Sequence, residues 1–210
     1  MRDRNAPLTP ADLDRLAWPK MEGLLPAIVQ DAGTGQVLML GYMDRAALAA
    51  TLDSGFATFF SRSKGRLWQK GETSGNRLIV KAVVADCDED ALLIRAVPEG
   101  PTCHLGTTSF FGADGPAGAG WLGKLARIVN ERAGADPGES YTARLFGEGP
   151  ARIAQKVGEE GVELALAAVS RDAEGCAEEA GDLLYHLTVL MEAKGFDWED
   201  VARVLAERHK

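Results

Sequence analysis

One short segment divides this chain of 210 residues into two parts. Between Gly112 and Gly120 it holds four glycines, three alanines and one proline in nine residues, and no side chain there can anchor a core. Glycine leaves the backbone free to adopt almost any φ, so we interpret residues 113–120 as a linker. The hydrophobic period also differs on its two sides, which favours a domain boundary. We therefore expect two domains, 1–112 and 121–210.

The two parts differ in the secondary structure that their apolar residues predict. β-Branched and aromatic residues of the first part favour strands at residues 27–30, 37–42, 58–62, 78–85 and 91–97. A short helix is expected at 45–52, capped by Asp44 and closed by Gly55. Apolar spacing in the second part is typical of amphipathic helices at residues 121–132, 151–169 and 176–193, with a last helix after Asp197. The predicted fold class is α+β in two domains, the first β-rich and the second all-α helical.

Charge and cysteine usage narrow the possible functions. Lys and Arg number 23 against 31 Asp and Glu, a net charge of −8, so the chain lacks the basic surface of a general DNA or RNA binder. No apolar run approaches the roughly 18 residues that cross a bilayer, and the N-terminal residues lack the apolar core of a secretory signal. Three widely spaced cysteines do not suit a disulfide framework. We expect a cytoplasmic protein with no nucleic-acid or membrane partner.

The helix predicted at 151–169 concentrates carboxylates on one side, and the following helix repeats the theme. The residues are Lys156, Glu159, Glu160 and Glu163 on the first helix and Glu179 and Asp182 on the second. Mutual repulsion destabilises such a cluster unless a hard cation relieves it, and Mg²⁺ prefers oxygen ligands. A solvated charged face is the alternative. No Lys or Arg follows these acids four residues later, so ion pairing along the helix is not expected to explain the cluster.

Three stretches of the second part resemble phosphoribosyl-ATP pyrophosphohydrolase, a member of the all-α nucleoside triphosphate pyrophosphohydrolases, over residues 121–210. They are residues 140–143, 152–160 and 182–187. The resemblance implies cleavage of phosphoribosyl-ATP to phosphoribosyl-AMP and pyrophosphate, with phosphate contacts from Arg152 and Lys156. It implies Mg²⁺ ligands at Glu159, Glu160, Glu163, Glu179 and Asp182. Among these, Glu160 and Glu163 are our candidates for the catalytic carboxylate that orients the attacking water.

A second acidic motif, Asp86-Cys87-Asp88-Glu89-Asp90, lies in the first part. In an extended chain, the three aspartates share one face and Cys87 points to the other. Three carboxylates suit Mg²⁺ and a thiolate suits zinc, so the opposite directions suggest two different metals, with Cys87 directed to another chain. A solvated acidic turn is the alternative interpretation.

Five stretches, this motif included, resemble phosphoribosyl-AMP cyclohydrolase over residues 20–112. They are residues 41–43, 60–63, 67–76, 86–88 and 100–104. The resemblance implies a homodimer, Mg²⁺ at Asp86, Asp88 and Asp90, and zinc at Cys87, Cys103 and a third cysteine seven positions later. That position is Phe110, which cannot ligate zinc, and we interpret Cys176 as a core residue of the other domain. Four possibilities stay open for this site: two thiolates and His104 bind zinc, the site binds zinc more weakly, it binds another metal, or the activity is lost.

Both resemblances in this order imply a bifunctional enzyme of histidine biosynthesis, with phosphoribosyl-ATP and phosphoribosyl-AMP as substrates. Its second reaction opens the adenine ring between N1 and C6, which a zinc-bound water of pKa about 7 suits, with His104 as the candidate for proton transfer. Candidates for substrate contact are Arg62, Lys70, Ser74, Asn76 and Trp68, the last either stacking on the base or packing in the core. Two alternatives stay open: only the pyrophosphohydrolase works because Phe110 replaces a ligand, or the chain is a non-catalytic nucleotide-binding module.

Overall fold

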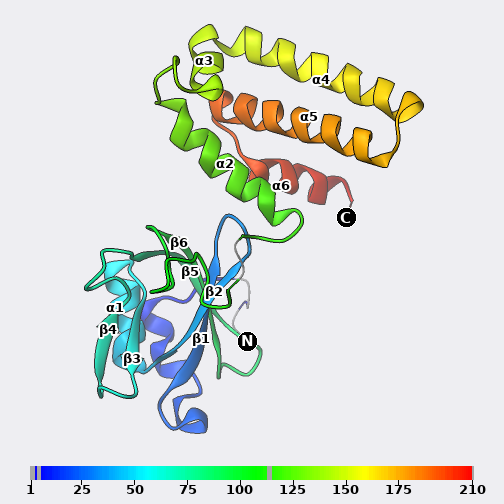
Figure 1. Ribbon diagram of the computed structural model, residues 1–210. Helices are drawn as coiled ribbons and strands as arrows, with labels where there is room; N and C mark the ends of the chain where they lie inside the picture. The colour runs from blue at the N-terminus through cyan, green and yellow to red at the C-terminus, as the bar shows by residue number, and fades with distance from the viewer. Residues whose placement is uncertain (1–2, 4–5, 113–114, 210) are drawn as a thin grey trace. The chain divides into compact units, whose positions relative to one another are not determined.

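The structure of the chain is a computed structural model, which describes residue 3, residues 6–112 and residues 115–209 (Figure 1). Its contacts divide the chain into two compact units, Met1–Gly120 and Trp121–Lys210. All strands of the described chain belong to the first unit and the long helices to the second, so the predicted α+β fold class is confirmed. Residues 113–114 of the predicted linker lie outside the described residues, and helix α2 (Gly120–Ala133) already includes the last linker residue. None of the described helices combines the length and the apolar character needed to cross a membrane.

A four-stranded sheet forms the centre of the first unit. Its strands are β1 (Leu25–Asp31), β2 (Val37–Met43), β5 (Leu78–Ala85) and β6 (Leu92–Pro98), in the order β2-β1-β6-β5. The β1–β2 and β5–β6 pairs are antiparallel, whereas β1 and β6 are parallel. Strands β1 and β2 form a hairpin, and buried Asp31 holds its loop by accepting the N–H groups of Gly33 and Thr34 at 2.8 and 3.1 Å.

A helix and a small second sheet complete this unit. They are α1 (Arg45–Ser54) and the antiparallel pair β3 (Thr58–Ser61) and β4 (Arg66–Gln69), preceded in the chain by 3₁₀ turns at Pro10–Arg15 and Trp18–Met21. Asp44 caps α1 by accepting the N–H of Ala47 at 2.7 Å, and Gly55 ends it at φ 73°, both as predicted. The core contains the fully buried Leu25, Leu38, Met43 and Leu48.

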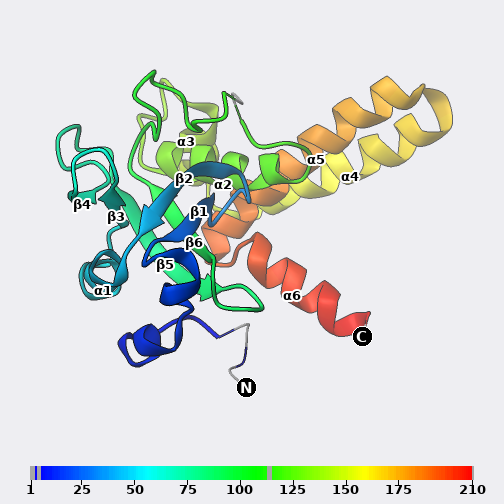
Figure 2. The same ribbon diagram turned by 90° about the horizontal axis from the view of Figure 1, so that it is seen from below.

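The second unit is entirely helical. Its helices after α2 are α3 (Tyr141–Glu148), α4 (Pro150–Ser170), α5 (Ala173–Lys194) and α6 (Trp198–Arg208). Asp172 and Asp197 cap α5 and α6 through their side chains, and Gly195 ends α5 at φ 73°. Helices α4 and α5 run side by side, and the end that connects them extends beyond α2 and α3 in two views (Figures 1 and 2).

The buried core of the second unit is small. Val129, Leu145, Ile153 and Val189 form its fully buried cluster, one from each of α2 to α5. Apolar side chains of α4 instead face solvent: Val162, Leu166 and Val169 are 59, 60 and 84 % exposed and recur at helical spacing. Cys176, expected in the core, is only half-buried. Partly buried side chains extend the fully buried cluster: Leu125, Phe146, Tyr185, Leu190 and Ala193.

Candidate active sites

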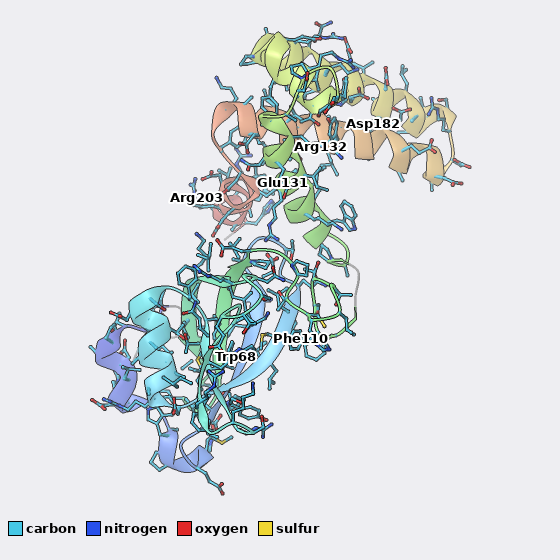
Figure 3. The ribbon with its side chains drawn as sticks, turned by 60° about the vertical axis from the view of Figure 1, so that its left-hand side comes forward. Trp68, Phe110, Glu131, Arg132, Asp182 and Arg203 are labelled. Atoms are coloured by element: carbon cyan, nitrogen blue, oxygen red, sulfur yellow. The ribbon has the colours of Figure 1, made fainter. Side chains whose placement is uncertain are left out.

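A cavity of about 510 Å³ gathers most of the residues predicted for the first site. Its walls come from residues 68–76 and 101–110, and include Trp68, Lys70, Ser74, Asn76, Cys103, His104 and Phe110. Trp68 and Phe110 are labelled in Figure 3. Arg62 is not among the lining residues, because its guanidinium lies over the ring of Tyr42, 3.9 Å from the centroid. Trp68 both lines the cavity and packs on the core, with its ring 5.9 Å from that of Phe59.

Lys70 is the buried charge of this cavity. It directly follows β4, its N–H donates to the carbonyl of Ala57 at 2.9 Å, and the residue is only 7 % exposed. Within the described residues no carboxylate lies at ion-pair distance from its ammonium, and burial lowers the pKa of Lys70. Glu72, on the same wall, is instead paired with Arg66 at 2.6 Å, which lowers the pKa of Glu72. Among the described residues, the ammonium of Lys70 is therefore left without a carboxylate partner.

Two glycines bring the walls of the cavity together. Gly71 adopts φ +87°, and a Cβ there would lie 2.6 Å from the backbone carbonyl of Asn76. Gly100 adopts φ +93°, and a Cβ there would lie 2.8 Å from the side-chain oxygen of Asn76. Only glycine tolerates both the positive φ and the approach, so these two loops fix the cavity in shape before any ligand enters.

The zinc ligands implied for this site are not assembled. Cys103 is buried, and its sulfur lies 3.9 Å from Nδ1 of His104. Cys87 is exposed, and Phe110 presents a hydrocarbon ring to the cavity in the place of the third thiolate. Within the described residues, neither cysteine belongs to a group of three His, Cys, Asp or Glu side chains close enough to share an ion. A three-thiolate zinc centre therefore does not fit this chain.

The acidic motif forms a turn rather than the extended segment that we expected. Strand β5 ends at Ala85, and Oδ1 of Asp86 then accepts the N–H groups of Asp90 and Ala91 at 3.0 and 3.1 Å. The turn brings carboxylate oxygens of Asp86, Asp88 and Asp90 within 4.8 Å of one another, as a divalent cation requires. The extended conformation from which we inferred opposite directions for Cys87 and the aspartates is absent, and the cysteine sulfur lies 3.7 Å from Oδ1 of the adjacent Asp88.

A lysine distant in sequence neutralises this turn. The ammonium of Lys20, in the second 3₁₀ turn, contacts the carboxylates of both Asp88 and Asp90. The same contact lowers the pKa of Asp88 and raises that of Lys20. Sequence reasoning missed Lys20, since 68 residues separate it from Asp88 and no local pattern links them.

In the second unit, helices α4 and α5 bring three acids together. Carboxylate oxygens of Glu160, Glu179 and Asp182 lie within 4.8 Å of one another, and Glu160 is 5 % exposed (Figure 3 labels Asp182). Glu159 and Glu163, predicted for the same cluster, are not in this group: Glu163 is exposed and Glu159 pairs elsewhere. Carboxylate oxygens from two facing helices, of the largely buried Glu160 and Glu179 and the exposed Asp182, form a donor set that suits Mg²⁺.

Ion pairs do stabilise this cluster, contrary to our expectation. Nζ of Lys156 lies 2.9 Å from Glu159 and 2.8 Å from Glu160, and these contacts raise the pKa of Lys156. The expectation considered only cations that follow the acids, whereas Lys156 precedes them by three and four residues. Arg152 approaches Glu159 at 3.5 Å, and Arg171 pairs with Glu179 at 2.6 Å. Both predicted phosphate-contact residues therefore lie beside the acids.

His186 also belongs to this neighbourhood. It is 5 % exposed, its Nδ1 lies 2.9 Å from the carbonyl of Asp182, and the same nitrogen is 3.5 Å from a Glu160 oxygen. The Tyr141 hydroxyl lies 3.1 Å from Nε2 on the other side of the ring. Nearby, the hydroxyl oxygens of Thr142 on α3 and Tyr185 on α5 lie 2.8 Å apart.

Comparison with known proteins identifies both units. Residues 39–112 match the family model of phosphoribosyl-AMP cyclohydrolase, and residues 122–209 match that of phosphoribosyl-ATP pyrophosphohydrolase. The fold and the two sites thus define a two-domain hydrolase.

Full-length relatives give the particular family. Proteins named histidine biosynthesis bifunctional protein HisIE are similar to this chain: 53 % identical in Vibrio cholerae over 94 % of this chain and 95 % of the relative. The protein of Xanthomonas axonopodis pv. citri is 55 % identical with the same coverage, and that of Escherichia coli K12 is 53 % identical over 97 % of this chain and 100 % of its own length. The chain belongs to the HisIE family of bifunctional hydrolases of histidine biosynthesis.

Proposed function

We propose that this chain cleaves phosphoribosyl-ATP to phosphoribosyl-AMP and pyrophosphate in a Mg²⁺-dependent reaction, and then opens the adenine ring of phosphoribosyl-AMP. The observation that carries the first step is the convergence of Glu160, Glu179 and Asp182 to within 4.8 Å. Helices α4 and α5 bring this group together from two directions. Ion pairs of Lys156 with Glu160 and of Arg171 with Glu179 offset part of its repulsion, and a shared divalent cation would offset the rest.

In the pyrophosphohydrolase site, Glu160, Glu179 and Asp182 are the proposed Mg²⁺ ligands. A bound Mg²⁺ supplies charge neutralisation to the leaving pyrophosphate. Arg152 and Lys156 bind phosphate oxygens, which requires Lys156 to exchange a carboxylate partner for the substrate.

The two remaining glutamates of this site have different proposed roles. Exposed Glu163, one turn beyond Glu160, orients the attacking water with Glu160 beside it. Glu159 stays a proposed ligand once the substrate takes Arg152 and Lys156 from it.

In the cyclohydrolase site, the cavity of the first unit binds the nucleotide. Trp68, Ser74 and Asn76 contact it from the cavity wall, and His104 transfers a proton during addition of water to the ring. Arg62, which does not line the cavity, stays a proposed substrate contact. Asp86, Asp88 and Asp90 are the proposed Mg²⁺ ligands, and their common 4.8 Å cluster supports this. Cys87 and Cys103 are the proposed zinc ligands. Because Phe110 leaves their donor set incomplete, the alternative is a chain in which only the pyrophosphohydrolase works.

We further propose that the chain acts as a homodimer. Exposed Val162, Leu166 and Val169 on α4, and the exposure of Cys87, both support a second copy that covers apolar surface or supplies a ligand.

The test is turnover by the purified full-length chain. Phosphoribosyl-ATP is incubated with Mg²⁺, and pyrophosphate and the ring-opened product are measured separately, with and without a chelator. Both products support the bifunctional enzyme. Pyrophosphate alone supports the single-activity alternative, and tight substrate binding with neither product supports a non-catalytic nucleotide-binding module.

A further inference from the structure

A buried hydroxyl in the cavity of the first unit has no partner. Thr102 is 1 % exposed and lines the cavity, yet its Oγ1 makes no hydrogen bond with any described residue. A buried hydroxyl without a hydrogen bond destabilises a fold, because the group loses its bonds to water and gains none in return. A valine of the same shape would avoid that penalty, so the unpartnered hydroxyl points to a ligand.

A second unmatched group lies on the same side of the cavity. Lys70 is 7 % exposed, and its ammonium interacts electrostatically with Cys103, the residue next to Thr102. The described residues offer it no carboxylate, because Glu72 is engaged by Arg66 through two hydrogen bonds. A buried cation that no carboxylate pairs is costly, and an anionic ligand relieves the cost.

The two groups require the same chemistry. We infer that Lys70 and Thr102 together form a phosphate subsite of this cavity, the ammonium supplying charge and the hydroxyl a hydrogen bond to one phosphate group. A purine base offers hydrogen-bond acceptors but no charge, and so leaves the ammonium unmatched. A phosphate monoester satisfies both donors through different oxygens.

The inference deepens the proposed function. It rests on that function in one respect, which is that the ligand of the cavity is a nucleotide. It assigns Thr102 a role that no motif suggested, and it places the phosphate against Lys70 rather than against Arg62, which lies over Tyr42 outside the cavity. Phosphoribosyl-AMP carries two phosphate groups, one on the AMP side and one on the added phosphoribosyl group, and the subsite takes one of them.

Binding without turnover tests the subsite. The full-length chain is titrated calorimetrically, in the presence of a chelator, with two pairs of probes: AMP against adenosine, and ribose 5-phosphate against ribose. We expect a preference for the phosphorylated member of at least one pair, and which pair shows it identifies the phosphate that is held. Lys70→Gln should reduce that preference about ten- to a hundredfold, and Thr102→Val about three- to tenfold.

Three controls make the outcome decisive. Lys81→Gln removes an exposed lysine of β5 outside the cavity and should leave the preference unchanged. Thr102→Ser should retain it, because the hydroxyl stays. Without ligand, Thr102→Val should melt at or above the wild-type temperature, since it removes an unsatisfied hydroxyl.

Three results would overturn the subsite. The first is equal affinity for both members of each pair. The second is a preference for the phosphorylated member that survives Lys70→Gln. The third is a Lys70→Gln variant whose only change is the rate at which Cys103 is alkylated. Since no chemistry is measured, an inactive cyclohydrolase would contradict the proposed function and leave this result intact.

Discussion

The ammonium of Lys156 lies 2.8 Å from the carboxylate of Glu160, one helical turn further along α4. Glu160 in turn lies within 4.8 Å of Glu179 and Asp182 on α5. One carboxylate is thus shared by a lysine of its own helix and by a cluster that suits a divalent cation. The ammonium stabilises a group of acids that would otherwise repel one another.

Replacing the central carboxylate should abolish pyrophosphate release. Glu160→Gln keeps the shape of the side chain but removes the charge that both the cation and Lys156 require, so we expect a fall in kcat of at least about a hundredfold. The matched variant is Glu163→Gln, whose carboxylate is exposed and outside the group, and whose loss should raise the barrier less. Circular dichroism checks that both variants fold. Wild-type turnover by Glu160→Gln would remove this residue from the site.

Removing the ammonium should make the second unit depend on Mg²⁺ for stability. In Lys156→Met, Glu159 and Glu160 lose their shared partner, so without Mg²⁺ the melting temperature should fall by about 4–8 °C for each kcal/mol lost. Added Mg²⁺ should raise the melting temperature of this variant more than that of the wild type. Lys156→Arg is the control that keeps the charge. An equal Mg²⁺ effect on all three proteins would show that the acids do not bind the ion.

Restoring the missing thiolate should strengthen zinc binding. Phe110→Cys places a sulfur where the ring now lines the cavity with Cys103 and His104. We expect a higher zinc content after dialysis against a weak chelator, and, with Co²⁺ as probe, a thiolate charge-transfer band stronger by about half, as three thiolates replace two. Phe110→Ser is the control without a thiol. If the cysteine variant retains no more metal than this serine variant, position 110 lies outside any metal site.

The tyrosine of α5, Tyr185, should titrate above the ordinary range of a tyrosine. Burial raises the pKa of Tyr185, although its contact with Thr142 acts in the opposite direction. The folded pKa therefore exceeds the unfolded value of about 10, and the folded state keeps a proton that the unfolded chain loses. Stability from this group is present below pH 10 and is lost as the pH rises above it. Tyrosinate absorbance measures the titration, and Tyr185→Phe should remove a step that lies above the ordinary tyrosine range; an unchanged titration curve in this variant contradicts the assignment.

A methyl group at Gly71 should disrupt the cavity wall. The positive φ and the 2.6 Å approach to Asn76 together make alanine unfavourable, and we expect Gly71→Ala to lower the free energy of unfolding of the first unit by about 1–3 kcal/mol. Gly75→Ala is the matched control, since its φ is also positive at +78° but a Cβ would meet nothing within 4 Å. Urea unfolding compares the two. Equal destabilisation would mean that backbone strain alone, and not the close approach, matters.

Local signals allowed much of the fold to be predicted from the sequence. Asp44 and Gly55 bound α1 because capping and left-handed termination depend on a few adjacent residues. Two elements were missed for equally local reasons. Strand β4 has four residues without alternating burial, and α3 has only eight, so neither carries enough periodicity to stand out.

The sites were less predictable, because they depend on contacts between distant segments. Helical spacing identified Glu160 and Glu179 but could not show that Glu163 faces solvent, since that depends on how α4 rotates against α5. Residues 86–90 form a turn where we expected an extended segment, because the carboxylate of Asp86 accepts two backbone N–H groups. Lys20 and the unpartnered hydroxyl of Thr102 appear only in three dimensions.

Because the core of the second unit is small, we expect the stability of this unit to depend on protein concentration. In an isolated copy of the chain, Val162, Leu166 and Val169 face water. A second copy would bury this apolar surface. Melting of the helical half should then shift upward as the protein is concentrated, by mass action.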